Sequence, residues 1–163
     1  MNTRTPALLL IVLLCTLINT PSLAQKSLPP ERAAAAREAL VAWFECVECS
    51  DGELDRVLQH GTDVESALIS TLRGGPSPAK RADIEERLRT QYRANKWPPG
   101  PGEQQYVEAN GANAEQIYRL RAITALGRLR TPAAVQALKQ AASTHSPYTD
   151  IVKRAAQDAL RSG

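Results

Sequence analysis

Two cysteines separated by two residues, Cys46 and Cys49, are the part of this 163-residue sequence most suited to chemistry. In an oxidising compartment such a pair can close a disulfide, because residues three apart on a helix have α-carbons about 5 Å apart, within the range that a disulfide allows. We therefore expect a disulfide between Cys46 and Cys49 that ties a first helix to the turn before a second one.

The same cysteine spacing occurs in redox, haem and metal centres. A thioredoxin-like centre needs a lowered thiol pKa, whereas this pair lies near the end of a predicted helix and among carboxylates, namely Glu45, Glu48, Asp51 and Glu53. A c-type haem attachment needs histidine after the second cysteine, and Ser50 stands there, which excludes haem on this motif. A metal site could combine the pair with His60 and a carboxylate, although no second close pair of ligands is visible. A redox centre, a metal site and unpaired or intermolecular thiols stay open as alternatives to the disulfide.

Elsewhere the sequence offers little that indicates catalysis. We find no phosphate-binding glycine loop, no nucleophile elbow and no pair of histidines spaced as helical metal ligands. His60 and His145 stand alone, and we expect both to be ordinary surface or turn residues. We therefore predict that the protein is not an enzyme and has no catalytic, cofactor-binding or metal-binding residue.

The basic residues do not predict a nucleic-acid partner. The net charge is +3 for the whole sequence and +2 without residues 1–24, too small to favour a polyanion. At 100° per residue, Arg121 and Arg128 point one way from their predicted helix, and Arg119 and Arg130 point nearly the opposite way. We expect these arginines to be solvated and not to form one phosphate-binding stripe.

Residues 1–24 have the features of a secretory signal peptide. Arg4 supplies a positive charge, residues 7–18 form an apolar run, and Ser22-Leu23-Ala24 offers small residues for cleavage. The run is about a dozen residues long, whereas a membrane-spanning helix needs roughly 20, so a retained anchor is the less favoured alternative. We expect cleavage after Ala24, a periplasmic or secreted location, and no membrane span in the remaining chain.

The composition of residues 25–163 favours one all-α domain, because alanine is abundant and the whole sequence has only seven aromatic residues. The apolar spacing predicts a first helix with one buried face, formed by Ala36, Leu40, Trp43, Phe44 and Val47. Short helices are predicted to follow capping boxes at Ser50/Glu53 and Thr62/Glu65, the first of them ending at Gly61. Ser77-Pro78 predicts the start of a helix that runs to about Ala94.

A Pro- and Gly-rich crossing over residues 96–102 divides an irregular N-terminal part, residues 31–95, from a more regular part, residues 103–163. Trp97 in this crossing is either packed on the core or a possible partner-binding anchor. After the crossing we predict a helix from about Glu103 that falters at Asn110-Gly111 and continues from Ala114 to Leu129.

Residues 114–163 resemble HEAT repeats of the bacterial type. The segment 118–129 is an alanine-rich helix that contains Ala125-Leu126-Gly127, then a turn with Thr131-Pro132 leads to a second helix, residues 133–142. A further repeat opens at residues 152–160, and aligning Ala125-Leu126 with Ala159-Leu160 gives a spacing of 34 residues. Residues 57–72 resemble the same pattern more weakly.

The resemblance implies a short array of helical hairpins, an α-solenoid, whose extended surface binds another protein. On this interpretation the chain is an exported adaptor or scaffold without an activity of its own. The alternative from a different class is a small thiol oxidoreductase or a metal-binding protein that uses Cys46 and Cys49.

Overall fold

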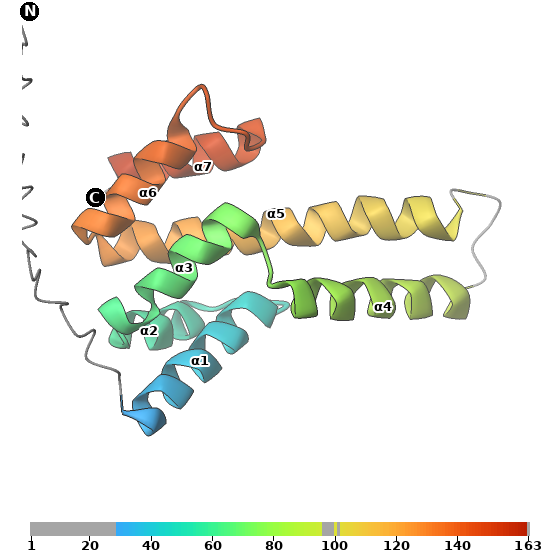
Figure 1. Ribbon diagram of the computed structural model, residues 1–163, viewed down its shortest axis with the longest axis horizontal. Coiled ribbons are helices and arrows are strands. Elements are labelled where there is room, and N and C mark those ends of the chain that lie inside the picture. The colour runs from blue at the N-terminus through green and yellow to red at the C-terminus, as the bar shows by residue number, and fades with distance from the viewer. Residues whose placement is uncertain (1–28, 96–99, 101, 163) are drawn as a thin grey trace, which may run out of the picture.

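The computed structural model describes residues 29–95, 100 and 102–162, and within these ranges the chain contains helices and no strand (Figure 1). The predicted all-α fold is therefore confirmed, and the packing of helix on helix is consistent with a helical repeat array. The predicted signal peptide (1–24) and Trp97 lie outside the described residues. The described helices are α1 (Pro30–Glu45), α2 (Asp51–Gln59), α3 (Thr62–Gly74), α4 (Pro78–Ala94), α5 (Glu103–Leu129), α6 (Pro132–Ala142) and α7 (Asp150–Arg161).

The long helix α5 is the axis of the structure, because it packs against each of the other described helices. Around its C-terminal half, α1 and α2 lie on one side and α6 and α7 on the other, with α3 crossing it (Figure 1). Its N-terminal half runs beside α4, and these two helices extend away from the rest of the molecule (Figure 1). We call this pair the α4–α5 hairpin.

The core is one cluster of apolar side chains, and every fully buried residue that the structure describes is apolar or glycine or proline. Its largest members come from both halves of the chain: Val57, Val64, Leu68, Leu72, Ile123, Leu126, Leu138 and Val152. Ile84, the buried apolar residue of α4, and Val107, that of the N-terminal half of α5, lie outside this cluster. Most of the burial that stabilises the fold is thus located away from the hairpin.

Small residues let α5 and α7 approach closely. Ala125-Leu126 and Ala159-Leu160, the two segments aligned at the 34-residue spacing, lie on helices that pack directly together. A Cβ atom added at Gly127 would lie 2.9 Å from the Cβ of Ala159. Such a contact is too short for a real pair of carbon atoms, so glycine is required here by the helix spacing.

Replacing Gly127 with alanine should therefore destabilise the protein, and Gly111 offers a matched control on the same helix. A Cβ at Gly111 would meet nothing within 4 Å, so Gly111→Ala should raise the free energy of unfolding by about 0.5–1 kcal/mol through helix propensity. In Gly127→Ala the same gain is outweighed by overpacking of about 1–3 kcal/mol. Urea denaturation measures both. Equal stabilisation by the two variants would contradict the close approach of α5 and α7.

Several predicted helix ends are confirmed. Ser50 and Glu53 form the predicted capping box, in which the Glu53 carboxylate accepts a hydrogen bond from the Ser50 amide at 2.9 Å. The Ser50 hydroxyl also donates to this carboxylate, and the hydrogen bonds from the hydroxyl and the amide hold the pKa of Glu53 below its usual value. Ser77 caps α4 by accepting from the Lys80 amide, and α4 ends at Ala94 as predicted. Gly61 separates α2 from α3 with a φ of 53°, a conformation that glycine adopts without strain.

The second predicted capping box, Thr62/Glu65, is wrong. Gly61 is the residue that precedes α3, and the Thr62 side chain caps nothing. The Glu65 carboxylate instead accepts a hydrogen bond from Thr131, whose hydroxyl also accepts from the Ala134 amide at the start of α6. The Glu65 side chain therefore bonds a residue that is distant in the sequence and does not cap its own helix, as the local pattern predicted.

The predicted break at Asn110-Gly111 is also wrong, because α5 is continuous from Glu103 to Leu129. The Asn110 side-chain amide donates to the Tyr106 carbonyl at 2.8 Å, one turn earlier on the same helix. Packing along α4 supplies the remaining support. The helix cost of one glycine, about 1 kcal/mol, is small enough for this packing to offset.

Candidate functional site

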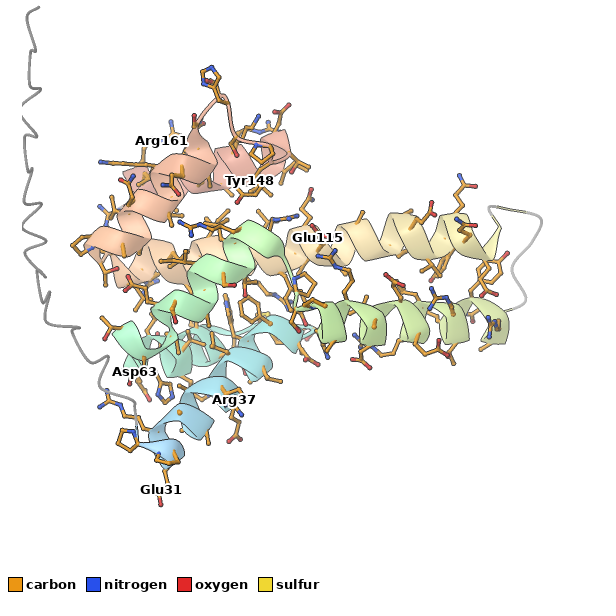
Figure 2. All side chains as sticks on the ribbon, in the orientation of Figure 1. Glu31, Arg37, Asp63, Glu115, Tyr148 and Arg161 are labelled. Carbon is orange, nitrogen blue, oxygen red and sulfur yellow. A yellow bond between two sulfur atoms is a disulfide. The ribbon has the colours of Figure 1, made fainter. Side chains whose placement is uncertain are left out.

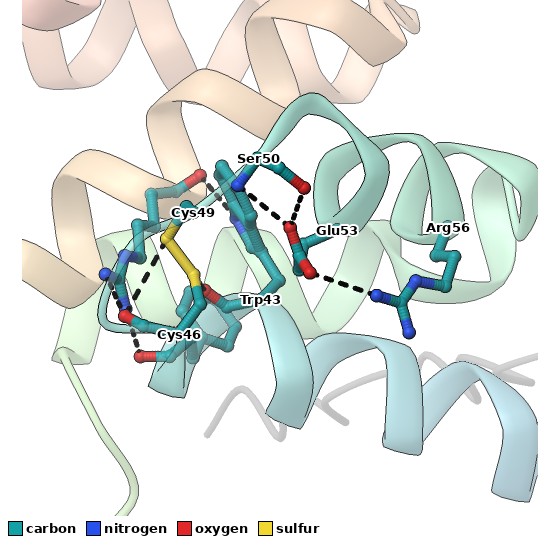
Figure 3. Close-up of a disulfide and its surroundings, with 8 residues drawn as sticks. Trp43, Cys46, Cys49, Ser50, Glu53 and Arg56 are labelled. Carbon is teal, nitrogen blue, oxygen red and sulfur yellow. Dashed lines mark hydrogen bonds and ion pairs between the residues drawn. A yellow bond between two sulfur atoms is a disulfide. The ribbon is translucent and has the colours of Figure 1, made fainter.

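The predicted disulfide between Cys46 and Cys49 is present, with the two α-carbons 5.3 Å apart (Figure 3). It does not lie within a helix, because α1 ends at Glu45 and Cys46 already has an extended backbone. The four-residue loop 46–49 joins the end of α1 to Ser50, the N-cap of α2. The disulfide thus lies in the expected place, the connection between the first helix and the start of the second.

The prediction of a buried face on the first helix is wrong at Val47. The spacing placed it on the buried face, whereas its side chain is 96% exposed at the tip of the disulfide loop. The other four residues of the predicted face do pack on or in the core: Ala36, Leu40, Trp43 and Phe44. Val47 fails the pattern because the helix has ended two residues earlier, so the helical period no longer applies.

Arg121 of α5 holds the end of α1 in place. Its Nη1 donates to the Phe44 carbonyl at 2.5 Å and its Nη2 to the Cys46 carbonyl at 2.6 Å. Carbonyls at a helix C-terminus lack partners within the helix and attract a cation. In return, Trp43 Nε1 donates to the Arg121 carbonyl at 3.1 Å. The loop is therefore fixed to α5 as well as being closed by its disulfide.

The expectation of solvated arginines on α5 holds only in part. Arg128 and Arg130 are exposed, although Arg130 reaches the carbonyls of Ala159 and Leu160. Arg121 is partly buried, and this burial lowers its pKa from the usual value. Arg119 forms an ion pair with Glu115 and lies over the aromatic ring of Tyr148. The helical angle alone could not predict this, because it takes no account of neighbouring helices.

A groove lined by apolar side chains together with Glu45, Arg87, Gln91 and Arg121 lies beside the α4–α5 hairpin, next to the disulfide loop. Its volume is about 370 Å³. We call it the apolar groove and define it by residues of the loop (Phe44, Glu45, Cys46, Val47), of α4 (Ile84, Arg87, Leu88, Gln91) and of α5 (Ala114, Ile117, Tyr118, Arg121). Phe44 stacks on Tyr118 at 5.1 Å between ring centres and forms its inner wall. Ile117 is 38% exposed here, so two exposed apolar side chains, Val47 and Ile117, face one depression.

The opposite side of the hairpin is charged. A broader cavity of about 760 Å³ lies there, and half of its lining residues are charged: Arg81, Glu85, Arg89, Glu103, Glu108 and Glu115. Ion pairs cross or follow this side: Arg81 with Glu115 at 3.5 Å, Arg89 with Glu85 at 3.1 Å, and Arg93 with Glu103 at 2.7 Å. Glu115 lies where the hairpin meets the rest of the molecule (Figure 2). The hydrogen bond from Arg93 lowers the pKa of Glu103.

The remaining sequence candidates do not come together in the described part of the chain. His145 is exposed in the α6–α7 loop and His60 is half-buried at the end of α2. Among the residues that the structure describes, no group of three His, Cys, Asp or Glu side chains is arranged to hold a metal ion. None of the described helices combines the length and the apolar character needed to cross a membrane.

Sequence reasoning missed the apolar groove. The four-residue spacing of Ile84 and Leu88 is a sequence signal for one face of a helix, but it does not show that this face borders α5 and the loop. Ile117 and Arg121 carry a similar four-residue spacing on α5. No signal in the sequence shows that these residues line the same groove, because that depends on the register between α4 and α5.

Comparison with protein-family models, with curated proteins and with solved structures finds no match to this chain. The class that can be stated is therefore the one given by the structure: an all-helical protein with a disulfide-closed loop beside an apolar groove.

Removing the Arg121 side chain should cost about 2 kcal/mol of unfolding free energy, because the carbonyls of Phe44 and Cys46 lose charge-assisted hydrogen bonds. The measurement is urea denaturation of Arg121→Ala. Arg128→Ala is the control, since Arg128 is an exposed residue of the same helix, and it should change stability by less than about 0.5 kcal/mol. Equal effects of the two variants would show that Arg121 does not hold the loop.

Removing the disulfide should lower stability without unfolding the protein. For a four-residue loop the chain-entropy estimate is about 2 kcal/mol, and the Arg121 contacts remain in place. Cys46→Ser/Cys49→Ser should keep the helical circular dichroism of the parent and melt at a lower temperature. Dithiothreitol should lower the melting temperature of the parent to a similar value and leave the double variant unchanged. A reductant effect on the double variant would contradict this account.

Proposed function

We propose that this chain is an exported, non-enzymatic adaptor of the HEAT-like repeat class that binds another protein. The observation that carries the proposal is the apolar groove, in which Val47 and Ile117 are exposed beside a loop that a disulfide and Arg121 hold in place. Exposed apolar side chains around a preformed depression are typical of sites that bind a partner. Fold class alone would not support this.

The signal-peptide features of residues 1–24 and the disulfide support the compartment named in this proposal. Disulfides form and persist in oxidising compartments, which include the bacterial periplasm and the extracellular space. A periplasmic or secreted location after cleavage behind Ala24 is therefore part of the proposal. The partner is a protein, because a depression that combines apolar side chains with one carboxylate and two guanidinium groups suits a protein surface better than a nucleic acid, which is bound mainly through its phosphates.

A thiol oxidoreductase is the second candidate, and one observation favours it. Cys49 is exposed and directly precedes Ser50, the N-cap of α2, and a helix N-terminus stabilises a thiolate. Against it, the nearby side chains of Glu48, Asp51 and Glu53 are carboxylates, which destabilise a thiolate. A metal-binding use of the cysteines would require the disulfide to open.

Copurification of the tagged full-length protein with and without its cysteines tests both candidates. The protein is expressed in its natural host, crosslinked briefly and recovered from the export compartment, with Cys46→Ser/Cys49→Ser alongside. We expect one main partner that both versions recover in similar amounts. Many partners that are lost with the cysteines would favour thiol exchange, and recovery of no partner by either version would contradict the adaptor proposal.

A further inference from the structure

The two cysteines of the disulfide differ in their access to solvent. Cys49 is exposed, whereas Cys46 is half-buried and packs against the hydrophobic core. The Cys46 Sγ lies 3.1 Å from the carbonyl oxygen of Trp43, a buried residue of α1 (Figure 3). A thiolate that opens a disulfide must reach the sulfur that it attacks, so access helps to decide which of the two sulfurs reacts. In this loop, access favours attack at Cys49.

The surroundings of Cys46 suit the sulfur that leaves. The Arg121 guanidinium group donates to the Cys46 carbonyl at 2.6 Å, which places a positive charge beside the residue that receives the departing electron pair. Once the Cys46 sulfur has taken a proton, the Trp43 carbonyl oxygen at 3.1 Å is a hydrogen-bond acceptor for the new thiol. Because Arg121 also fixes this carbonyl to α5, we expect the end of α1 to stay in place when the disulfide opens.

The charges beside Cys49 favour one kind of thiol. Glu48 and Asp51 are exposed and flank Cys49 in the sequence. Glu53 forms an ion pair with Arg56 at 3.1 Å, but among the described residues no basic side chain lies within ion-pair distance of Glu48 or Asp51. Carboxylates without a counter-charge attract a cationic reagent and repel an anionic one.

We propose that Cys49 is a site of reversible modification by a small aminothiol, a thiol that also carries a positive charge. The thiolate of the aminothiol attacks Cys49 Sγ and forms a mixed disulfide there. The bond between Cys46 and Cys49 breaks, and its electron pair leaves on Cys46 Sγ, which takes a proton from water. One disulfide replaces another, so no oxidant is consumed, and the reverse attack by Cys46 restores the loop. The chain is the substrate of this exchange and not its catalyst, which goes beyond the proposed adaptor function.

The position of the first adduct tests the choice of sulfur. The purified protein is mixed with cysteamine, exchange is stopped with acid at short times, and peptide mass spectrometry locates the added thiol. We expect at least about five times more adduct on Cys49 than on Cys46, because Cys46 is the less accessible of the two. An equal distribution, or an excess on Cys46, overturns the assignment.

Single-cysteine variants keep the test decisive when the mixed disulfide is too short-lived to be counted. Cys46→Ser leaves the Cys49 thiol and Cys49→Ser leaves the Cys46 thiol, and each variant reacts with cystamine, the disulfide of cysteamine. With folding checked by circular dichroism, we expect Cys46→Ser to react about tenfold faster. In urea, where both chains are unfolded, the difference should disappear. Equal rates in the folded variants overturn the proposal.

Three thiols of similar size test the selection by charge: cysteamine is positive, 2-mercaptoethanol is neutral and 2-mercaptoethanesulfonate is negative. The rate at which each opens the loop disulfide is divided by its rate with uncharged 2-hydroxyethyl disulfide, which removes differences in thiol reactivity. At low salt we expect this ratio to be about fivefold higher for cysteamine than for the sulfonate, with a smaller difference at high salt. Ratios that do not depend on the charge of the thiol overturn the aminothiol assignment.

A matched pair of variants locates the charge that is responsible. Glu48→Gln should reduce the preference for cysteamine, because it removes a carboxylate next to Cys49. Glu31→Gln removes an exposed carboxylate at the distant start of α1 (Figure 2) and should leave the preference unchanged. Equal effects of the two variants would mean that only the net charge of the protein matters, which overturns the local selection at Cys49.

Discussion

Arg121 joins parts of the chain that are 75 and 77 residues apart, because its guanidinium group bonds the carbonyls of Cys46 and Phe44. These carbonyls end α1, so the direction in which the chain leaves that helix depends on a side chain of α5. The Trp43 indole returns a hydrogen bond to the Arg121 backbone, which makes the contact reciprocal. This contact and the Cys46–Cys49 disulfide together fix the loop at the end of α1, where Val47 is exposed.

Features that a few neighbouring residues determine could be predicted from the sequence. Ser77-Pro78 begins α4 because a hydroxyl cap and a proline act within one turn, and the cysteine pair closes because its spacing permits it. Features that depend on distant packing could not be predicted. Glu65 bonds Thr131 across 66 residues, and α5 passes through Asn110-Gly111 because a neighbouring helix supports it.

The same distinction explains what was predicted of the candidate site. Cys46 and Cys49 carry a local signal, so both their disulfide and the alternatives to it could be argued from spacing and neighbouring charge. Arg121 carries none, because on its own helix it is one of several arginines, and its role appears only when α1 is brought against α5. The groove is less predictable still, since it requires two helices and a loop to be placed together.

The hairpin contains little that would hold it in place by itself. Its two helices bury Ile84 and Val107 between them, and the ion pairs on its charged side, such as Arg93 with Glu103, are largely exposed, where each contributes at most about 1 kcal/mol. Apolar burial is therefore scarce along the segment that carries the groove. Opening of the hairpin therefore exposes less apolar surface than opening of the core around Leu68, Leu126 and Leu138, and it should cost less free energy.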